Sequence, residues 1–447
     1  MKKFVLSVAL MAVYILAFAQ ENEPKKIELT DQERQLVESN NDFAFNLFRK
    51  ARGNQSSIMS PLSITYALGL LNNGAAGQTQ KEINDVLGFG DVGADAINAF
   101  CRKMLTEAPT LDNTTAAEIA NTVFVNSGQN CVLQQGFIEK ANQYYDAEPQ
   151  SINFYEKQNA MGIINGWAND RTHGMIPMLF DEETFNVDAV SYLLNALYFK
   201  GAWTYKFDKK NTKEEPFNGG EAVPMMQQSG VAYESTWNSL YQAIHLPYGN
   251  GAYKMTIILP QEGKSIDDVL SQLNGSNWNF KGWKDEIDLK LPRIKTDTFL
   301  PLVEIMKELG MITAFTPWAE FPYFCNSDVY ISNMFQKAAI ELDEEGTEAA
   351  AVTVIEVEKT AITPYFYADR PFIYIISEQS TGTIFFIGQF TGKEMPSTIT
   401  FPSVQKNPSN DDAIYDLSGR LFNSQFVIHN SQLPKRIYIQ NGHKFLK

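Results

Sequence analysis

The spacing of apolar and polar residues changes along the chain, from a helical period near the start to strand-like runs toward the end. Residues 30–49 carry apolar side chains at a loose helical spacing, which predicts an amphipathic helix. Ser60 and Pro61 favour the start of a second helix, because serine caps a helix and proline suits its first turn. The run Asn72-Asn73-Gly74 is typical of the end of that helix.

Dense apolar runs of four or five residues dominate the second half of the chain. They fall at residues 255–259, 372–376 and 384–387. Runs of this density are typical of strands buried on both faces. Early helices followed by late strands predict an α+β fold rather than a regular alternation of strand and helix.

Both ends differ from this central part. Residues 1–19 combine Lys2 and Lys3 with an uncharged apolar run and an Ala-Phe-Ala cleavage pattern, which predicts a secretory signal. The run is too short to span a membrane, so we expect an exported protein, either secreted, periplasmic or at the cell surface. Residues 395–412 are rich in proline, serine, threonine and asparagine and read as a linker. We therefore expect a main domain over residues 20–394 and a basic appendage over 413–447.

Composition and charge exclude several classes of function. Of 447 residues, 37 are Lys or Arg and 52 are Asp or Glu, which gives a net charge of −15. An acidic chain argues against nucleic-acid binding, which relies on cations to neutralise phosphates. Cys101, Cys131 and Cys325 are too few and too scattered for a disulfide scaffold, and we expect buried, inert thiols. With only four histidines, the sequence predicts no metal site and no cofactor.

The search for catalytic motifs indicates that the protein is not an enzyme. Residues 88–93 satisfy GxGxxG, but a predicted helix precedes them where a dinucleotide fold needs a strand. Residues 263–265 resemble the end of a phosphate loop, yet Ile258 stands where its first glycine belongs. His173 and His245 lie in contexts that favour structural or surface roles, although a dispersed catalytic triad is not detectable from sequence.

The most unusual segment spans residues 343–370. At strand period, alternate positions from 347 to 357 are all uncharged, while Glu348, Glu356 and Glu358 fall on the opposite parity. This pattern favours a strand with one face against a core. Alanine and glutamate are good helix formers, however, so an ordinary solvated helix remains open.

The segment, together with several others, resembles the serpin family, specifically inhibitory serpins of a bacterial secreted type. Matches run in the family's order from about residue 41 to residue 393. The matching segments are residues 60–64 (SPLSI), 73–79 (NGAAGQT), 172–177 (THGMIP), 195–203 (NALYFKGAW), 259–263 (LPQEG), 344–351 (EEGTEAAA) and 366–373 (FYADRPFI).

The resemblance implies a fold of three β-sheets with eight or nine helices and an exposed reactive-centre loop. It also implies a monomer that traps proteases as a suicide inhibitor, when the cleaved loop inserts into the central sheet. The implied hinge comprises Glu344, Gly346, Thr347, Glu348, Ala349, Ala350, Ala351, Val352 and Thr353. The region implied to open the sheet comprises Ser60, Ser63, Asn195, Gln336 and Trp203. The chain departs from the family in Gln336, where many members have histidine, and in Val352, where alanine is common.

The family's spacing also places the bait bond. The hinge glycine of inhibitory members lies fourteen residues before the residue that donates the scissile carbonyl, which from Gly346 gives Thr360–Ala361. Threonine suits elastase-like and subtilisin-like proteases, and the preceding bond, Lys359–Thr360, suits trypsin-like ones. A non-inhibitory serpin that acts as a binding or carrier protein is the alternative. Residues 413–447 resemble the end of the C-terminal sorting domains of Bacteroidota-type secretion.

Overall fold

The computed structural model describes residues 24–90, 92–347 and 364–392, apart from the side chains of residues 195–197, and the backbone of four short strands after residue 413. The chain divides into two compact units, Met1–Met395 and Pro396–Lys447. The expected signal at residues 1–19 and linker at 395–412 lie outside the described residues.

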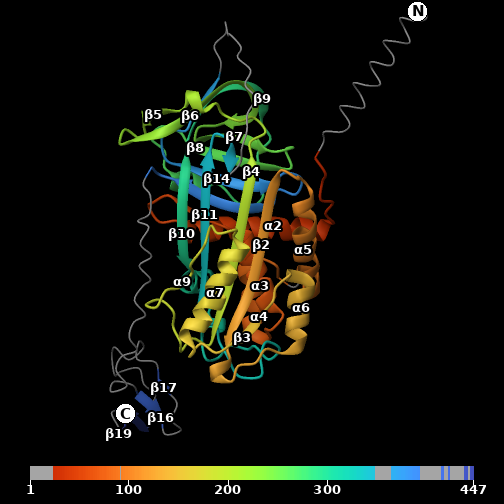
Figure 1. Cartoon of the computed structure of the whole chain (residues 1–447), viewed down its shortest axis with the longest axis vertical. Coiled ribbons are helices and arrows are strands. Elements are labelled where there is room, and N and C mark those ends of the chain that lie inside the picture. The colour runs from red at the N-terminus through yellow and green to blue at the C-terminus, as the bar shows by residue number, and fades with distance from the viewer. Residues whose placement is uncertain are drawn as a thin grey trace, which may run out of the picture. The chain divides into compact units, whose positions relative to one another are not determined.

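Eight α-helices lie in the described part of the first unit (Figure 1). They are α2 (Asp31–Ala51), α3 (Pro61–Asn72), α4 (Gly77–Leu87), α5 (Ala94–Glu107), α6 (Gln135–Tyr145), α7 (Lys157–Arg171), α8 (Ile266–Leu270) and α9 (Val303–Leu309). The two predicted helices are confirmed as α2 and α3. Thr30 caps α2 in a capping box with Glu33, and the Ser60 hydroxyl caps α3 by accepting a hydrogen bond from the Ser63 amide. All twelve residues of α3 are buried, so this helix runs through the core.

Nine strands form one sheet, in the order β1-β15-β14-β8-β7-β6-β9-β13 with β5 paired to β6. Their bounds are β1 (Ser57–Met59), β5 (Lys213–Pro216), β6 (Ala222–Trp237), β7 (Tyr241–Tyr248), β8 (Tyr253–Pro260), β9 (Trp283–Pro292), β13 (Tyr365–Tyr367), β14 (Phe372–Glu378) and β15 (Ile384–Phe390). The three predicted apolar runs fall in β8, β14 and β15, which are buried along their whole length, and the strand predictions are confirmed.

Six strands form a second sheet, in the order β10-β11-β12-β4-β2-β3. Their bounds are β2 (Thr115–Asn126), β3 (Gln150–Ile152), β4 (Ser191–Ala202), β10 (Ile294–Pro301), β11 (Asn333–Asp343) and β12 (Gly346–Thr347). The α+β class is confirmed. Of the three expected sheets, two are continuous here, because the long strand β6 pairs with β9 along one edge and with β5 and β7 along two stretches of its other edge.

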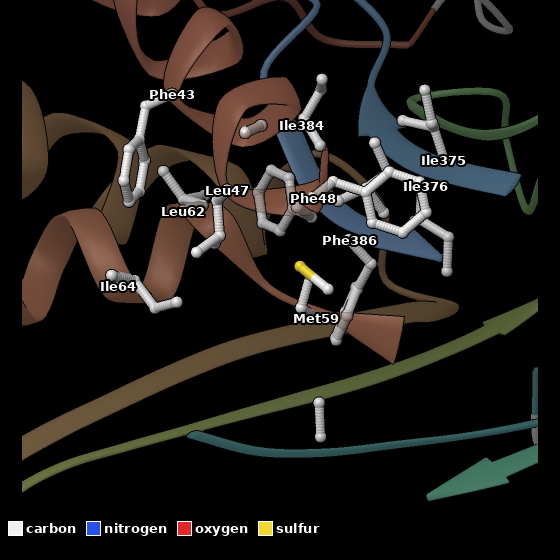
Figure 2. Packing of buried hydrophobic residues seen from close by; sticks show 14 of the residues in the cluster. Phe43, Leu47, Phe48, Met59, Leu62, Ile64, Ile375, Ile376, Ile384 and Phe386 are labelled. Carbon is white, nitrogen blue, oxygen red and sulfur yellow. The ribbon is translucent and has the colours of Figure 1, made fainter. Parts of the chain in front are cut away.

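The six-stranded sheet separates two hydrophobic clusters. On one face, Tyr192 and Phe335 belong to a cluster that includes residues of α7, the helix that crosses the sheet in Figure 1. On the other face, Leu193 and Met334 belong to the main core, which also holds α2, α3, β14 and β15. Figure 2 shows side chains of these four elements and of Met59 in this core, with Ile375 and Ile376 on opposite sides of β14. Neighbouring residues of a strand point to opposite faces, and the alternation therefore fixes which face of the sheet meets the core.

Four short strands are described in the second unit. They are β16 (Ile414–Asp416), β17 (Leu421–Phe422), β18 (Ile437–Gln440) and β19 (His443–Leu446), and they form an antiparallel sheet in the order β17-β16-β18-β19. Two of them, β16 and β18, coincide with the strand-like runs predicted at this end of the chain. Among the residues that the structure describes, no helix is both long enough and apolar enough to cross a membrane.

Candidate functional site

The site is the seam between β4 and β11, two neighbouring strands that part along their length. At their first residues the strands pair directly and in parallel, from Asn333 opposite Tyr192 to Gln336 opposite Asn195. At their far ends the short strand β12 lies between them and pairs antiparallel with both. The seam is therefore closed at one end and already occupied by the start of a third strand at the other.

Two residues make up β12, and each is fitted to its place. Gly346 adopts φ +135°, and a Cβ atom there would clash with the carbonyl oxygen of Gly201, so only glycine fits. Thr347 is 3% exposed, stands opposite Leu342 of the main core, and places its Oγ1 3.1 Å from the Tyr248 hydroxyl. Thr347 therefore points to the core face of the sheet.

Two buried carboxylates hold the turn that leads into β12. Glu344 is fully buried and accepts hydrogen bonds from Arg293, whose Nη2 lies 2.7 Å from Oε1, and from the Thr212 hydroxyl. Burial alone would raise the pKa of Glu344, but these donors hold it below its ordinary value. Glu345, 4% exposed, pairs with Lys206 at 3.0 Å and with a second lysine at 3.5 Å. The turn is thus anchored by ion pairs rather than by apolar packing.

Trp203 fixes the same turn from β4's side. Its backbone amide donates to the carbonyl oxygen of Glu345 at 2.9 Å, and its indole Nε1 donates to that of Asp343 at 3.0 Å. Its ring stacks on Tyr248, with centroids 4.5 Å apart and planes 8° from parallel. A rigid aromatic pair therefore lies beneath the point at which the chain enters the seam.

Gln336 bridges β11 to the start of α3 near the closed end of the seam. Its side-chain oxygen accepts from the Ser60 amide at 2.8 Å, and its nitrogen donates to the Ser60 carbonyl at 2.9 Å and to the Ser63 hydroxyl at 2.8 Å. All three residues are buried. An amide suits this position because it donates and accepts at once, so the glutamine completes a network without needing a charge.

The structure brings the predicted sheet-opening residues together only in part. Ser60, Ser63 and Gln336 form one cluster, and the backbone of Asn195 stands opposite Gln336. Trp203 lies instead at the far end of the seam, beside the hinge. The remaining predicted hinge and bait residues lie outside the described residues: Glu348, Ala349, Ala350, Ala351, Val352, Thr353, Lys359, Thr360 and Ala361.

Sequence reasoning missed the basic and aromatic residues that anchor the hinge. Arg293 separates β9 from β10, and it lies 51 positions from Glu344. Tyr248 lies 99 positions from Thr347. No local pattern links residues so far apart, and only the strand order of the two sheets brings them into contact.

The weaker motifs have structural roles. Gly88 ends helix α4 in a left-handed conformation, so a helix does precede the GxGxxG run and a dinucleotide fold is absent there. His245 is buried, stacks on Phe280 and lies 2.8 Å from the Thr256 hydroxyl. Burial and the neighbouring Lys254 lower the pKa of His245 to about 3, which keeps the ring neutral. His173 is exposed beside Glu118.

Comparison with known proteins agrees with this geometry. The family model described as "Serpin (serine protease inhibitor)" matches residues 38–392. Iripin-8 of Ixodes ricinus is 32% identical over 389 residues, covering 81% of this chain and 94% of that protein. Human thyroxine-binding globulin superposes with a TM-score of 0.73 at 26% identity, over 80% of this chain and 98% of that one. The native thermophilic serpin Tengpin superposes with a TM-score of 0.73 at 25% identity, and the match covers 82% of this chain and 96% of Tengpin. The chain belongs to the serpin family, a family of protease inhibitors rather than of enzymes.

Proposed function

We propose that this serpin is a suicide inhibitor of serine proteases whose cleaved loop enters the seam between β4 and β11. The observation that carries the proposal is that Gly346 and Thr347 already occupy the seam as β12, hydrogen-bonded on both sides. A protease that cuts the loop beyond β12 frees the chain to continue along the path that these two residues begin. Insertion then releases strain stored in the uncut protein.

The length of the seam supports this path. Extending the register in which Gly346 faces Ala202 puts Val357 opposite Ser191, the first residue of β4. Extending the register with β11 in the same way puts Glu356 opposite Asn333, the first residue of β11. Twelve residues, Gly346 to Val357, therefore fill the seam along β4, and two of them are already in place as β12. In this extended chain the proposed bait residue, Thr360, ends about 44 Å from Thr347, at roughly 3.4 Å per residue, and carries the acylated protease to that position.

The sequence of the segment suits the two faces it would meet. Thr347 points to the core, so the same parity carries uncharged residues to the core face and leaves the glutamates on the other. The extended register sets Thr353 opposite Gln336 on one side and Asn195 on the other. A threonine hydroxyl there can hydrogen-bond to the Gln336 amide as the strands part.

Insertion also improves the hydrogen bonding of the sheet. The direct pairing of β4 with β11 is parallel, whereas β12 pairs antiparallel with each. A full-length inserted strand replaces one parallel ladder with two antiparallel ladders, which are slightly more stable per residue. The uncut protein is therefore held by a kinetic barrier rather than by the lowest free energy.

The proposed bait bond is Thr360–Ala361, and Lys359–Thr360 is a second one. The protease nucleophile attacks the Thr360 carbonyl, the amine of Ala361 leaves, and the acyl-enzyme is carried along the seam before water can release it. Elastase-like and subtilisin-like proteases would use the first bond and trypsin-like proteases the second.

A protease panel tests the proposal. The protein is incubated with an elastase-like and a trypsin-like serine protease, SDS-stable complexes are sought, and the released C-terminal fragment is sequenced. We expect complexes and fragments that begin at Ala361 or Thr360. A fragment with another first residue would refute the bond, and cleavage without any SDS-stable complex would refute the trapping mechanism.

A non-inhibitory binding or carrier protein is the second candidate, and the similarity to a thyroxine-binding globulin favours it. Heating distinguishes the two. Cleavage in the loop should raise the melting temperature of an inhibitor strongly because the cut loop inserts, and an unchanged melting temperature would favour the carrier.

We further propose that residues 1–19 direct export and that residues 413–447 act as a sorting tail joined by the linker 395–412. This organisation makes the protein an exported, bacterial-type serpin, secreted, periplasmic or at the cell surface. Mass spectrometry of the exported protein tests the tail, because an intact Lys447 would argue against sorting with cleavage.

A further inference from the structure

Two of the three cysteines lie against each other. Cys131 and Cys325 are separated by 194 positions, yet their Sγ atoms are 2.9 Å apart. They are 1% and 3% exposed. Each sulfur is therefore in contact with the other, so two of the three cysteines that are scattered along the sequence form a pair in the structure.

The backbone around the pair is firmly connected. Leu133 and Cys325 form an antiparallel bridge, and the Asn326 amide donates to the Val132 carbonyl at 3.0 Å. The amide of Gln134 donates to the carbonyl of residue 324 at 2.9 Å. These bonds hold the two segments at the spacing that neighbouring strands adopt, so the sulfurs meet without rearrangement of either segment.

The pair connects the two sides of the seam. Cys131 follows β2, which pairs with β4, and Cys325 precedes β11. The end of β2 nearest Cys131 lies beside the start of β4, because Val125 stands opposite Ser191. The first residue of β11, Asn333, pairs with the next residue of β4. The two sulfurs thus join chain segments that lead to the directly paired end of the seam from opposite flanks.

We propose that Cys131 and Cys325 form a disulfide that crosslinks the β4 flank to the β11 flank, and that Cys101 stays a thiol. The sulfurs need to approach by less than about 1 Å to reach the S–S length of roughly 2.05 Å. Cys101 is fully buried elsewhere, beside Tyr145, and burial raises its pKa to about 12.

The oxidant is a disulfide, either of low molecular weight or on a thiol oxidoreductase. The Cys325 thiolate attacks one sulfur of that disulfide, forms a mixed disulfide and expels the first thiol. The Cys131 thiolate then attacks the Cys325 sulfur and expels the second thiol, so two protein thiols are oxidised as one disulfide is reduced to two thiols. A hydrogen bond from Cys131 lowers the pKa of Cys325 to about 7, which suits it to the first attack. Because both sulfurs are buried, the exchange takes place as the protein folds or opens locally.

Thiol counting and peptide mapping test the bond. The full chain is refolded with oxidised glutathione, denatured, alkylated and weighed, with the same protein reduced beforehand as reference. We expect one alkylated cysteine after oxidation, three after reduction, and a crosslinked peptide pair containing Cys131 and Cys325. Three alkylated cysteines after oxidation, or a bond that includes Cys101, would overturn the proposal.

Melting temperature supplies a second readout. A crosslink across so long a loop should raise the melting temperature of the oxidised protein by roughly 3–6 °C over the reduced form. Cys101→Ser should keep that shift, and Cys325→Ser should lose it. Equal melting temperatures for the oxidised and reduced wild-type protein would count against a crosslink between the flanks.

Discussion

Under the proposed function, replacing Thr347 by arginine should convert the inhibitor into a substrate. Thr347 faces the core and is 3% exposed, and its hydroxyl oxygen lies 3.1 Å from the Tyr248 hydroxyl. An arginine at this position must either bury an unpaired guanidinium or withdraw β12 from the seam. Burying an unpaired charge costs several kcal/mol, so the chain should leave the seam and reinsertion after cleavage should slow.

The magnitude follows from the competition between insertion and release of the acyl-enzyme. If about 3 kcal/mol of the burial cost enters the insertion barrier, insertion slows by about a hundredfold, since 1.36 kcal/mol is tenfold. A protein in which insertion normally outruns deacylation by about tenfold would then deacylate about ten times for each protease that it traps. The number of inhibitor molecules consumed per trapped protease should therefore rise from near one to about ten.

The assay titrates a protease that cuts the loop with increasing amounts of each variant and follows residual activity and SDS-stable complexes. Thr347→Val is the matched control: it adds no charge and loses only the hydroxyl contact with Tyr248, so it should trap with nearly the wild-type stoichiometry. Both variants should be cut at the same bond. An arginine variant that traps with the wild-type stoichiometry would refute the assignment of Thr347 to the core face of an inserting strand.

The other predictions concern the anchors of the seam and one buried histidine. Glu344→Gln should lower the melting temperature by roughly 2–4 °C because it weakens a buried charged hydrogen bond worth about 2 kcal/mol, whereas Glu341→Gln, whose ion pair is exposed, should change it little. An equal effect of both would contradict the anchor. Gln336→Ala should lower the melting temperature comparably, since it leaves buried groups at the start of α3 without partners, and an unchanged value would exclude that role. His245, with its pKa lowered to about 3, contributes stability above pH 6.5 that is lost as the pH falls toward 3; urea unfolding at several pH values should show a shallower decline for His245→Asn.

Local patterns predicted much of the fold. The predicted cap at Ser60 depends on residues within one helical turn, and the buried strands β8, β14 and β15 each contain a dense apolar run. The predicted hinge rests on a short motif whose residues are contiguous in the chain. Each of these signals is complete within about ten residues, which is the range over which sequence patterns carry structural information.

The anchors of the hinge depend on tertiary structure instead. Glu344 meets Arg293 because β10 pairs with β11, with Ile294 opposite Leu342, and Cys131 meets Cys325 because an antiparallel bridge joins segments 194 positions apart. The charge of Glu344 gave no sign that it would be fully buried, since glutamate is normally a surface residue. Arg293 supplies the opposite charge, and the free-energy cost of burying Glu344 is offset only when this ion pair forms.

The position of β12 bears on the order of events after cleavage. Placing the first residues of a strand between two others carries the entropic cost of closing a loop. Each later residue only extends hydrogen-bond ladders that already exist. Gly346 and Thr347 have completed the start in the uncut protein, and Glu344 holds it in place. In the proposed mechanism, the remaining barrier therefore lies at the opposite end of the seam, where β4 and β11 still pair directly and Gln336 connects β11 to α3. Insertion should proceed from β12 toward the end of the seam where β4 and β11 pair directly. The rate at which these two strands separate should decide whether a protease is trapped or released.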